Sequence, residues 1–73
     1  MRELEAVALA RGLPEHHLEA GDVGTIVMVH DATRGYEVEF ATLGGETIAV
    51  LTLPADAVRP LGQREIAHAR EVA

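Results

Sequence analysis

Apolar and polar residues alternate through the middle of the chain in the pattern of a β-sheet protein. Tyr36, Val38 and Phe40 are separated from one another by single acidic residues. This period of two predicts a strand with one buried face and one wet face. The acidic residues, Glu37 and Glu39, would lie on the wet face.

Four other segments have strand character: residues 3–10, 23–30, 46–53 and 58–61. The run from Ile48 to Leu53 is apolar and largely β-branched, which is typical of a buried strand. Pro54 would end that strand because proline has no N–H to donate. A single helical turn over 55–57 would then lead into the last strand.

Turns separate these segments at intervals of about ten to twelve residues, which is the spacing of an all-β meander. We expect a hairpin turn at residues 31–35 and a tight turn at 42–45. Gly24 lies inside a predicted strand, so it indicates either a bulge or a close backbone crossing.

The sequence therefore predicts an all-β fold, a small five-stranded SH3-like barrel over residues 3–61, followed by a short C-terminal helix in a tail at 62–73. Ile66, Ala69 and Ala73 recur at helical spacing within this tail. A helix of about ten residues is too short to persist alone in water. It would dock on its own barrel or on another chain.

Two predicted strands are apolar on both faces, which is more than one small barrel can hide. In residues 23–30 and 46–53, apolar residues occupy successive positions. We predict that the excess forms a partner-binding or self-association surface. Its members would be Val27, Val29, Ala49 and Leu51, with Glu37, Glu39 and Ile66 beside them. Alternatively, a bulge at Gly24 flips the register and the helix covers the remainder.

The charge balance bears on the kind of partner. Twelve acidic residues and six arginines give a net charge of −6, and the arginines are scattered along the chain. Nucleic-acid and anionic-membrane binders usually carry a clustered basic face, so neither is an expected partner. An acidic protein suits a basic protein partner. There is no cysteine, no apolar run approaching about 18 residues and no basic leader, so we expect a cytoplasmic protein without disulfides.

Candidate chemistry is sparse, and we predict no enzymatic activity, cofactor, metal or small-molecule substrate. His16 and His17 are adjacent on a loop, whereas chelating pairs are normally spaced along a helix or strand. Glu37 and Glu39 would be about 7 Å apart on one strand face. Acid–base work by such a pair also needs a cleft, for which a chain of 73 residues has little room.

Two resemblances extend this interpretation. The segment Ala20-Gly-Asp-Val-Gly-Thr-Ile-Val27 resembles the KOW-type strand-turn of ribosomal and transcription proteins. Four blocks in order resemble a bacterial family of short proteins catalogued only as a domain of unknown function: Leu13-Pro-Glu-His, Gly21 to Val27, Tyr36 to Phe40 and Gly45 to Leu53. That resemblance implies a stand-alone SH3-like barrel, with no catalytic residues to transfer. Some members are encoded beside toxin-like or other partner genes, which implies an antitoxin or immunity role.

Three functions thus remain open. The first is a protein-interaction module that self-associates or caps a partner. The second is a KOW-like nucleic-acid or ribosome-associated module, which the charge opposes. The third is an accessory barrel of a larger metalloenzyme, like the small barrels of nitrile hydratase-type subunits.

Overall fold

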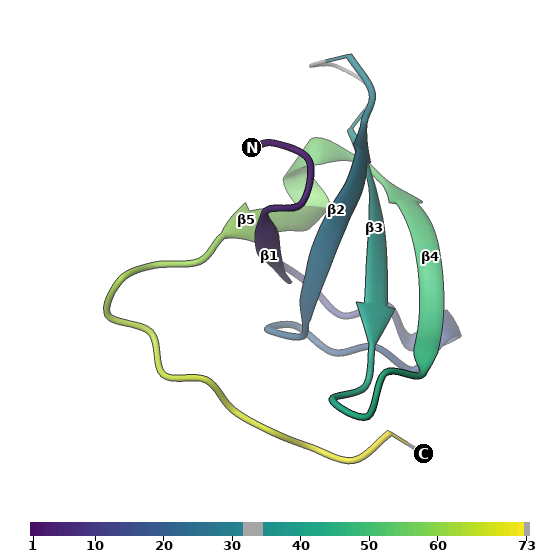
Figure 1. Cartoon of the computed structure of the whole chain (residues 1–73), viewed down its shortest axis with the longest axis vertical. Coiled ribbons are helices and arrows are strands. Elements are labelled where there is room, and N and C mark those ends of the chain that lie inside the picture. Colours follow the sequence, from purple (N-terminus) through teal and green to yellow (C-terminus); the bar gives the residue numbers. More distant parts are fainter. Residues whose placement is uncertain (32–34, 73) are drawn as a thin grey trace.

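The computed structural model describes residues 1–31 and 35–72, and within them five strands form one antiparallel sheet (Figure 1). The strands are β1 (Ala6–Leu9), β2 (Val23–Val29), β3 (Tyr36–Ala41), β4 (Thr47–Leu53) and β5 (Val58–Pro60). Two short 3₁₀ turns, η1 (Pro14–His16) and η2 (Ala55–Ala57), join β1 to β2 and β4 to β5. The all-β class and the five predicted strands are confirmed. The central part of the predicted hairpin turn at 31–35 lies outside the described residues.

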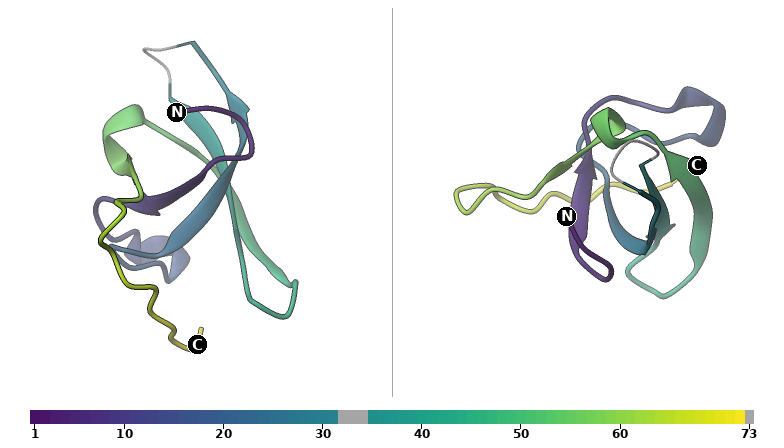
Figure 2. Two further views of the ribbon diagram at one scale, coloured as in Figure 1. Left: turned by 60° about the vertical axis from the view of Figure 1, so that its left-hand side comes forward. Right: turned by 90° about the horizontal axis from the view of Figure 1, so that it is seen from above.

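The five strands of the predicted SH3-like barrel are present, but the sheet that they form in the described residues is open and does not close into a barrel. The strand order is β4-β3-β2-β1-β5, which leaves β4 and β5 as the two edges. Seen from above in Figure 2, the sheet curls around its own core without its edges pairing. β5 is three residues long and ends at Pro60, which has no N–H to donate. Among the described strands it pairs with β1, and it is too short to reach β4 and close a barrel.

The core lies on the concave side of the curled sheet. Val38 and Phe40 supply it from β3, as their alternation with Glu37 and Glu39 predicts. The buried cluster consists of Val7, Leu9, Leu18, Ile26, Val38, Phe40, Leu53, Ala57 and Val58. It therefore draws on all five strands, on η2 and on the loop that precedes β2.

Each of the two strands that look apolar on both faces contains a β-bulge. Ile26 pairs with Val38 but Met28 pairs with Glu37, so Val27 is an extra residue in β2. Phe40 pairs with Ala49 but Ala41 pairs with Thr47, so Ile48 is the extra residue in β4. A bulge interrupts the period of two. Part of the apparent excess of apolar residues on these two strands therefore comes from the bulge residues, which interrupt the alternation.

Gly24 marks a close crossing and not a bulge. It pairs in regular register with Val7 of β1. A Cβ added to Gly24 would lie 2.6 Å from Val38 Cγ1 and 2.8 Å from Phe40 Cε1. Glycine is thus required here because the core side chains of β3 pass directly over the β2 backbone. The close-crossing alternative for Gly24 is confirmed, and the predicted register flip at this position does not occur.

The predicted C-terminal helix does not form in the described part of the tail. Residues 61–72 follow an irregular, extended path that leaves β5 and returns below the sheet (Figure 1). All of them are exposed, including Ile66 at 92%. A helix this short needs an apolar stripe buried against a neighbour, and the tail has none. No helix among the described residues is long and apolar enough to cross a membrane.

Candidate interaction surface

The convex side of the sheet is the candidate site, and the strand register assigns its residues. Residues directly opposite each other in an antiparallel pair project to the same face. One row across β2, β3 and β4 is Thr25, Glu39 and Val50, and the next is Met28, Glu37 and Thr52. Together with Val23, which lies two residues before Thr25 in β2, these rows form what we term the outer face.

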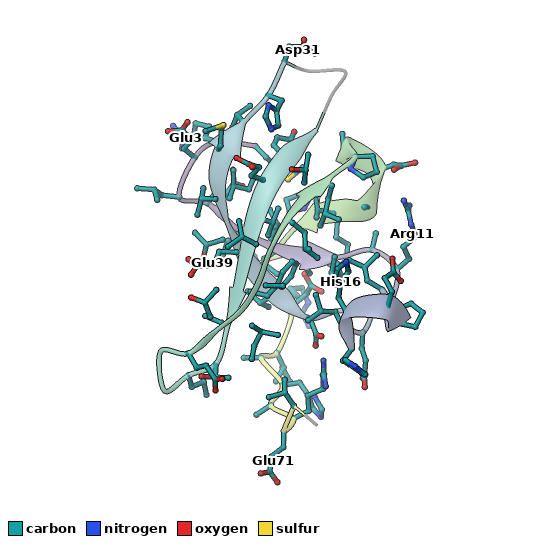
Figure 3. All side chains as sticks on the ribbon, turned by 90° about the vertical axis from the view of Figure 1, so that its right-hand side faces the viewer. Glu3, Arg11, His16, Asp31, Glu39 and Glu71 are labelled. Atoms are coloured by element: carbon teal, nitrogen blue, oxygen red, sulfur yellow. The ribbon has the colours of Figure 1, made fainter. Side chains whose placement is uncertain are left out.

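Apolar side chains on the outer face are exposed while its carboxylates are partly shielded. The exposed fraction is 53% for Val23, 45% for Met28 and 54% for Val50. Glu37 and Glu39 are half-buried between them. Figure 3 shows Glu39 on the opposite side of the molecule from Arg11 and His16. The outer face thus combines apolar contact area with fixed negative charge.

Glu39 is held in place by the neighbouring strand. The Thr47 hydroxyl donates a 2.7 Å hydrogen bond to Glu39 Oε2. Thr47 pairs with Ala41, two residues beyond Glu39 on β3, so the bond links β4 to β3 on the outer face. A carboxylate fixed in this way keeps acceptor capacity for a cation or an N–H donor of a partner.

The structure divides the seven predicted partner-binding residues into four groups, the fourth being Ala49 and Leu51, which lie on the core face. Glu37 and Glu39 lie on the outer face. Val27 and Val29 are each 39% exposed and lie at and beyond the bulge, and Val29 faces Tyr36. Ile66 is isolated on the tail.

The prediction that Ala49 and Leu51 face outward is corrected. They pair with Phe40 and Val38, so they lie on the core face, and Leu51 packs against the core cluster. Because Ile48 is an extra residue in β4, the inward–outward alternation from Ala49 onward does not continue that of Thr47. The exposed positions that the prediction missed are Val23, Met28 and Val50. Met28 and Val50 pair with Glu37 and Glu39, so aligning β2 and β4 with the strict alternation of β3 would have identified both as outward-facing.

A second feature is an ion pair that holds the tail against the loop before β2. The Arg70 Nε donates a 3.0 Å hydrogen bond to Asp22 Oδ1, and Arg70 also donates to the carbonyl of His17. The bond from Arg70 holds the pKa of the Asp22 carboxyl below its usual value, and the Glu19 N–H adds to this effect. Burial of Asp22 acts in the opposite direction, with an effect on the pKa smaller than that of the Arg70 hydrogen bond but larger than that of the Glu19 N–H. We term this contact the tail latch.

A second ion pair fixes the beginning of the tail. Glu65 accepts hydrogen bonds from the Arg59 guanidinium at 2.8 and 2.7 Å and also accepts one from the Gly62 N–H. Arg59, and to a lesser extent Gly62, lower the pKa of Glu65 to about 2. The bidentate geometry fixes the direction in which the chain leaves β5.

An open cavity of about 1020 Å³ lies between the tail and the sheet. One wall includes Val23, Phe40 and Ile48 of the sheet and Leu18 of the loop before β2, and the other wall is the tail itself. Because that second wall is an exposed segment held by ion pairs, the volume of the cavity depends on the tail latch. We do not assign a ligand to it.

In the part of the chain that the structure describes, the histidines and arginines do not converge on a site. His16 lies on η1 and His17 directly after it, His30 follows β2, and His68 lies in the tail. Within residues 1–31 and 35–72, no group of three His, Cys, Asp or Glu residues is placed to hold a metal ion. Three arginines form ion pairs with acidic residues of the same chain: Arg11 with Asp56, Arg59 with Glu65 and Arg70 with Asp22.

Comparison with known proteins identifies a family. The model of the family described as Domain of unknown function (DUF4926) matches residues 3–60, and the chain belongs to that family. The match ends where β5 ends, so it covers the sheet and excludes the tail. No curated protein and no solved structure matches the chain.

Proposed function

We propose that this DUF4926 member is a small non-enzymatic interaction module whose outer face binds a basic protein. The observation that carries the proposal is the outer face itself. Three exposed apolar side chains, Val23, Met28 and Val50, lie around two half-buried carboxylates, and the Thr47 hydroxyl holds one of these, Glu39, in place. Aliphatic contact area around a fixed charge provides both affinity and orientation in protein interfaces.

The charge of the chain supports a basic partner. Net charge is −6, and among the arginines that the structure describes, Arg11, Arg59 and Arg70 are engaged with acidic residues of the same chain. A negative field speeds encounter with a positively charged protein and disfavours nucleic acid. We place a co-encoded basic protein first among candidates, with the module acting as its antitoxin or immunity protein.

The SH3-like assignment belongs to the same proposal. It is supported by the strand order β4-β3-β2-β1-β5, by the single 3₁₀ turn between β4 and β5, and by the curl of the sheet. In this arrangement the convex side of the three longest strands is a continuous surface. The tail approaches the loop before β2 and does not form backbone hydrogen bonds with β3 or β4 in the described chain.

The test is capture of a partner followed by a measurement of affinity. The immobilised chain is incubated with native extract of its source cells, retained proteins are identified, and binding of the purified partner is measured by calorimetry. Glu39→Lys should weaken binding at least about tenfold, because it replaces a shielded acidic anchor by a like charge facing a basic surface. Met28→Ser should weaken binding by removing exposed apolar area.

The matched control is Glu15→Lys, which makes the same change of charge on η1, away from the outer face. It should reduce the association rate slightly and leave the dissociation rate unchanged. Raising the salt concentration should weaken binding of the wild-type chain. Equal effects of Glu39→Lys and Glu15→Lys would contradict the proposed site, and capture of RNA in place of protein would contradict the proposed partner.

A further inference from the structure

The tail latch has the geometry of arginine recognition. Asp22 accepts hydrogen bonds from the Arg70 guanidinium on both carboxylate oxygens, from Nε to Oδ1 at 3.0 Å and from Nη2 to Oδ2. The carbonyl of His17 accepts a further bond from Nη2 at 3.1 Å, and Glu19 Oε2 lies 3.7 Å from Nη1. A planar guanidinium can make such paired bonds to a carboxylate, whereas a lysine ammonium binds only as a point charge.

The acceptors are held in place by contacts that do not involve the tail. The Glu19 N–H donates a 2.8 Å bond to Asp22 Oδ2, and the Asp22 N–H donates to the carbonyl of Glu19 at 3.0 Å. Asp22 is also tied to β1, because its carbonyl accepts a bond from the Leu9 N–H at 2.9 Å. The His17 N–H donates to the carbonyl of Pro14 at 3.1 Å. A site that is ordered in advance loses less freedom when a ligand binds.

The tail around Arg70 contributes little to the contact. In the described chain, the hydrogen bonds between residues 66–72 and the loop before β2 are all donated by the Arg70 side chain. The family match ends at residue 60, so the acceptors lie inside the family domain and Arg70 lies outside it. The loop therefore recognises a guanidinium and not the tail sequence that carries it.

The site can be reached from solvent. The exposed fraction is 20% for the Asp22 side chain and 25% for the Arg70 side chain. An open cavity of about 340 Å³ is lined by Pro14, His17, Leu18, Glu19 and Arg70. The carboxylate is thus shielded enough to strengthen an ion pair, and another guanidinium could reach it once the Arg70 side chain has moved away.

We propose that Asp22, Glu19 and the carbonyl of His17 form a binding site for an arginine side chain of a partner protein, and that Arg70 occupies this site as a competitor within the chain. The net charge of −6 favours approach of a basic, arginine-bearing partner. The closed latch lowers the apparent affinity for that partner in proportion to the fraction of molecules in which the site is occupied. The site uses no carboxylate of the outer face and does not depend on the function proposed for that face.

The experiment is an NMR titration of the full-length ¹⁵N-labelled chain with a capped pentapeptide that copies residues 68–72. In Arg70→Gln the site is vacant, and the peptide should cause saturable shifts at the amides of residues 17–22. The dissociation constant should be at least about threefold lower than for the wild-type chain, where Arg70 must leave first. A peptide with lysine in place of its arginine should bind Arg70→Gln at least about threefold more weakly.

Three further variants separate this site from other causes. Arg64→Gln removes the same charge elsewhere in the tail and should bind the peptide like the wild type. Asp22→Asn, added to Arg70→Gln, keeps an acceptor for the Glu19 N–H but loses the charge, and the saturable shifts should disappear. Glu39→Gln, added to Arg70→Gln, should leave the peptide affinity unchanged, so failure at the outer face leaves this proposal intact.

Two outcomes would overturn the proposal, and neither depends on the Asp22 variant being folded. The first is equal affinity of the arginine peptide for Arg70→Gln and for the wild-type chain. The second is equal affinity of the lysine and arginine peptides for Arg70→Gln. Far-UV circular dichroism checks that each variant is folded.

Discussion

Arg70 and Asp22 are 48 positions apart in the chain, yet the Arg70 Nε donates a 3.0 Å hydrogen bond to Asp22 Oδ1. The Arg70 Nη1 also lies 3.7 Å from Glu19 Oε2. This contact is the principal link between the end of the exposed tail and the sheet. The position of the tail therefore depends on electrostatics and not on packing, and it should respond to charge, salt and pH.

Removal of the Arg70 charge should release the tail without unfolding the sheet. In Arg70→Gln, residues 66–72 lose the tail latch and should become mobile, because none of them belongs to the buried core. The midpoint of urea unfolding should hardly change, since exposed ion pairs contribute little. The ¹⁵N heteronuclear Overhauser effect of residues 66–72 measures the release. Arg64→Gln removes the same charge elsewhere in the tail and should leave these residues ordered; a tail equally ordered in both variants would contradict the latch.

Acid should release the tail, because both carboxylates that hold it become protonated. Folded-state pKa values of Asp22 and Glu65 are lowered, so their ion pairs stabilise the tail fully above the unfolded values, about 3.9 and 4.3. That contribution falls as pH drops toward about 2 for Glu65 and toward the lowered pKa of Asp22. Carboxyl chemical shifts over a pH titration test both groups. Titration of Asp22 at its unfolded value would mean that Arg70 does not engage it in solution.

Gly24→Ala should destabilise the sheet by about 1–3 kcal/mol. The new methyl group would lie within 2.9 Å of the Glu39 carbonyl and even closer to Val38 and Phe40, so the core must shift. The matched control is Gly44→Ala, where the nearest atom is Thr42 Oγ1 at 3.8 Å. That change should alter stability by less than about 0.5 kcal/mol. Urea denaturation measures both, and equal midpoints would contradict the close crossing.

Ile26→Ala should remove a large share of the total stability. Ile26 is fully buried, and such truncations cost about 2–5 kcal/mol. A chain of this size has only about 4–11 kcal/mol to lose. Ile66→Ala makes the same truncation at an exposed position and should change stability by less than about 0.5 kcal/mol. If Ile66→Ala were as destabilising as Ile26→Ala, the tail would have to pack against the sheet in solution.

The strands could be predicted from the sequence because their signals are local. The alternation from Tyr36 to Phe40 needs no information from elsewhere in the chain. Pro54 and the turn at η2 likewise follow from the chemistry of single residues. The open edges of the sheet could not be predicted in this way. They depend on whether β5 is long enough to pair with β4 as well as with β1, and that is a property of the whole fold.

The assignment of faces failed where the alternation is interrupted. Val27 and Ile48 occupy bulges, yet neither differs in type from the apolar residues around it. Register between strands therefore decides which residues face outward, and that is why Ala49 and Leu51 were placed on the wrong side. The tail was misassigned for a related reason. Its helical spacing is local, whereas the latch from Arg70 to Asp22 joins distant parts of the chain.

Pairing between β1 and β5 has a consequence for how the chain acquires its fold. Val7 is near the start of the family match and its partner Pro60 is at the end, so the first strand gains its second neighbour only when the last one arrives. Contacts between such distant positions slow folding, because a long loop must close first. During synthesis, Leu9 would stay uncovered until Val58 has left the ribosome. The sheet is thus completed only once the last strand has been made.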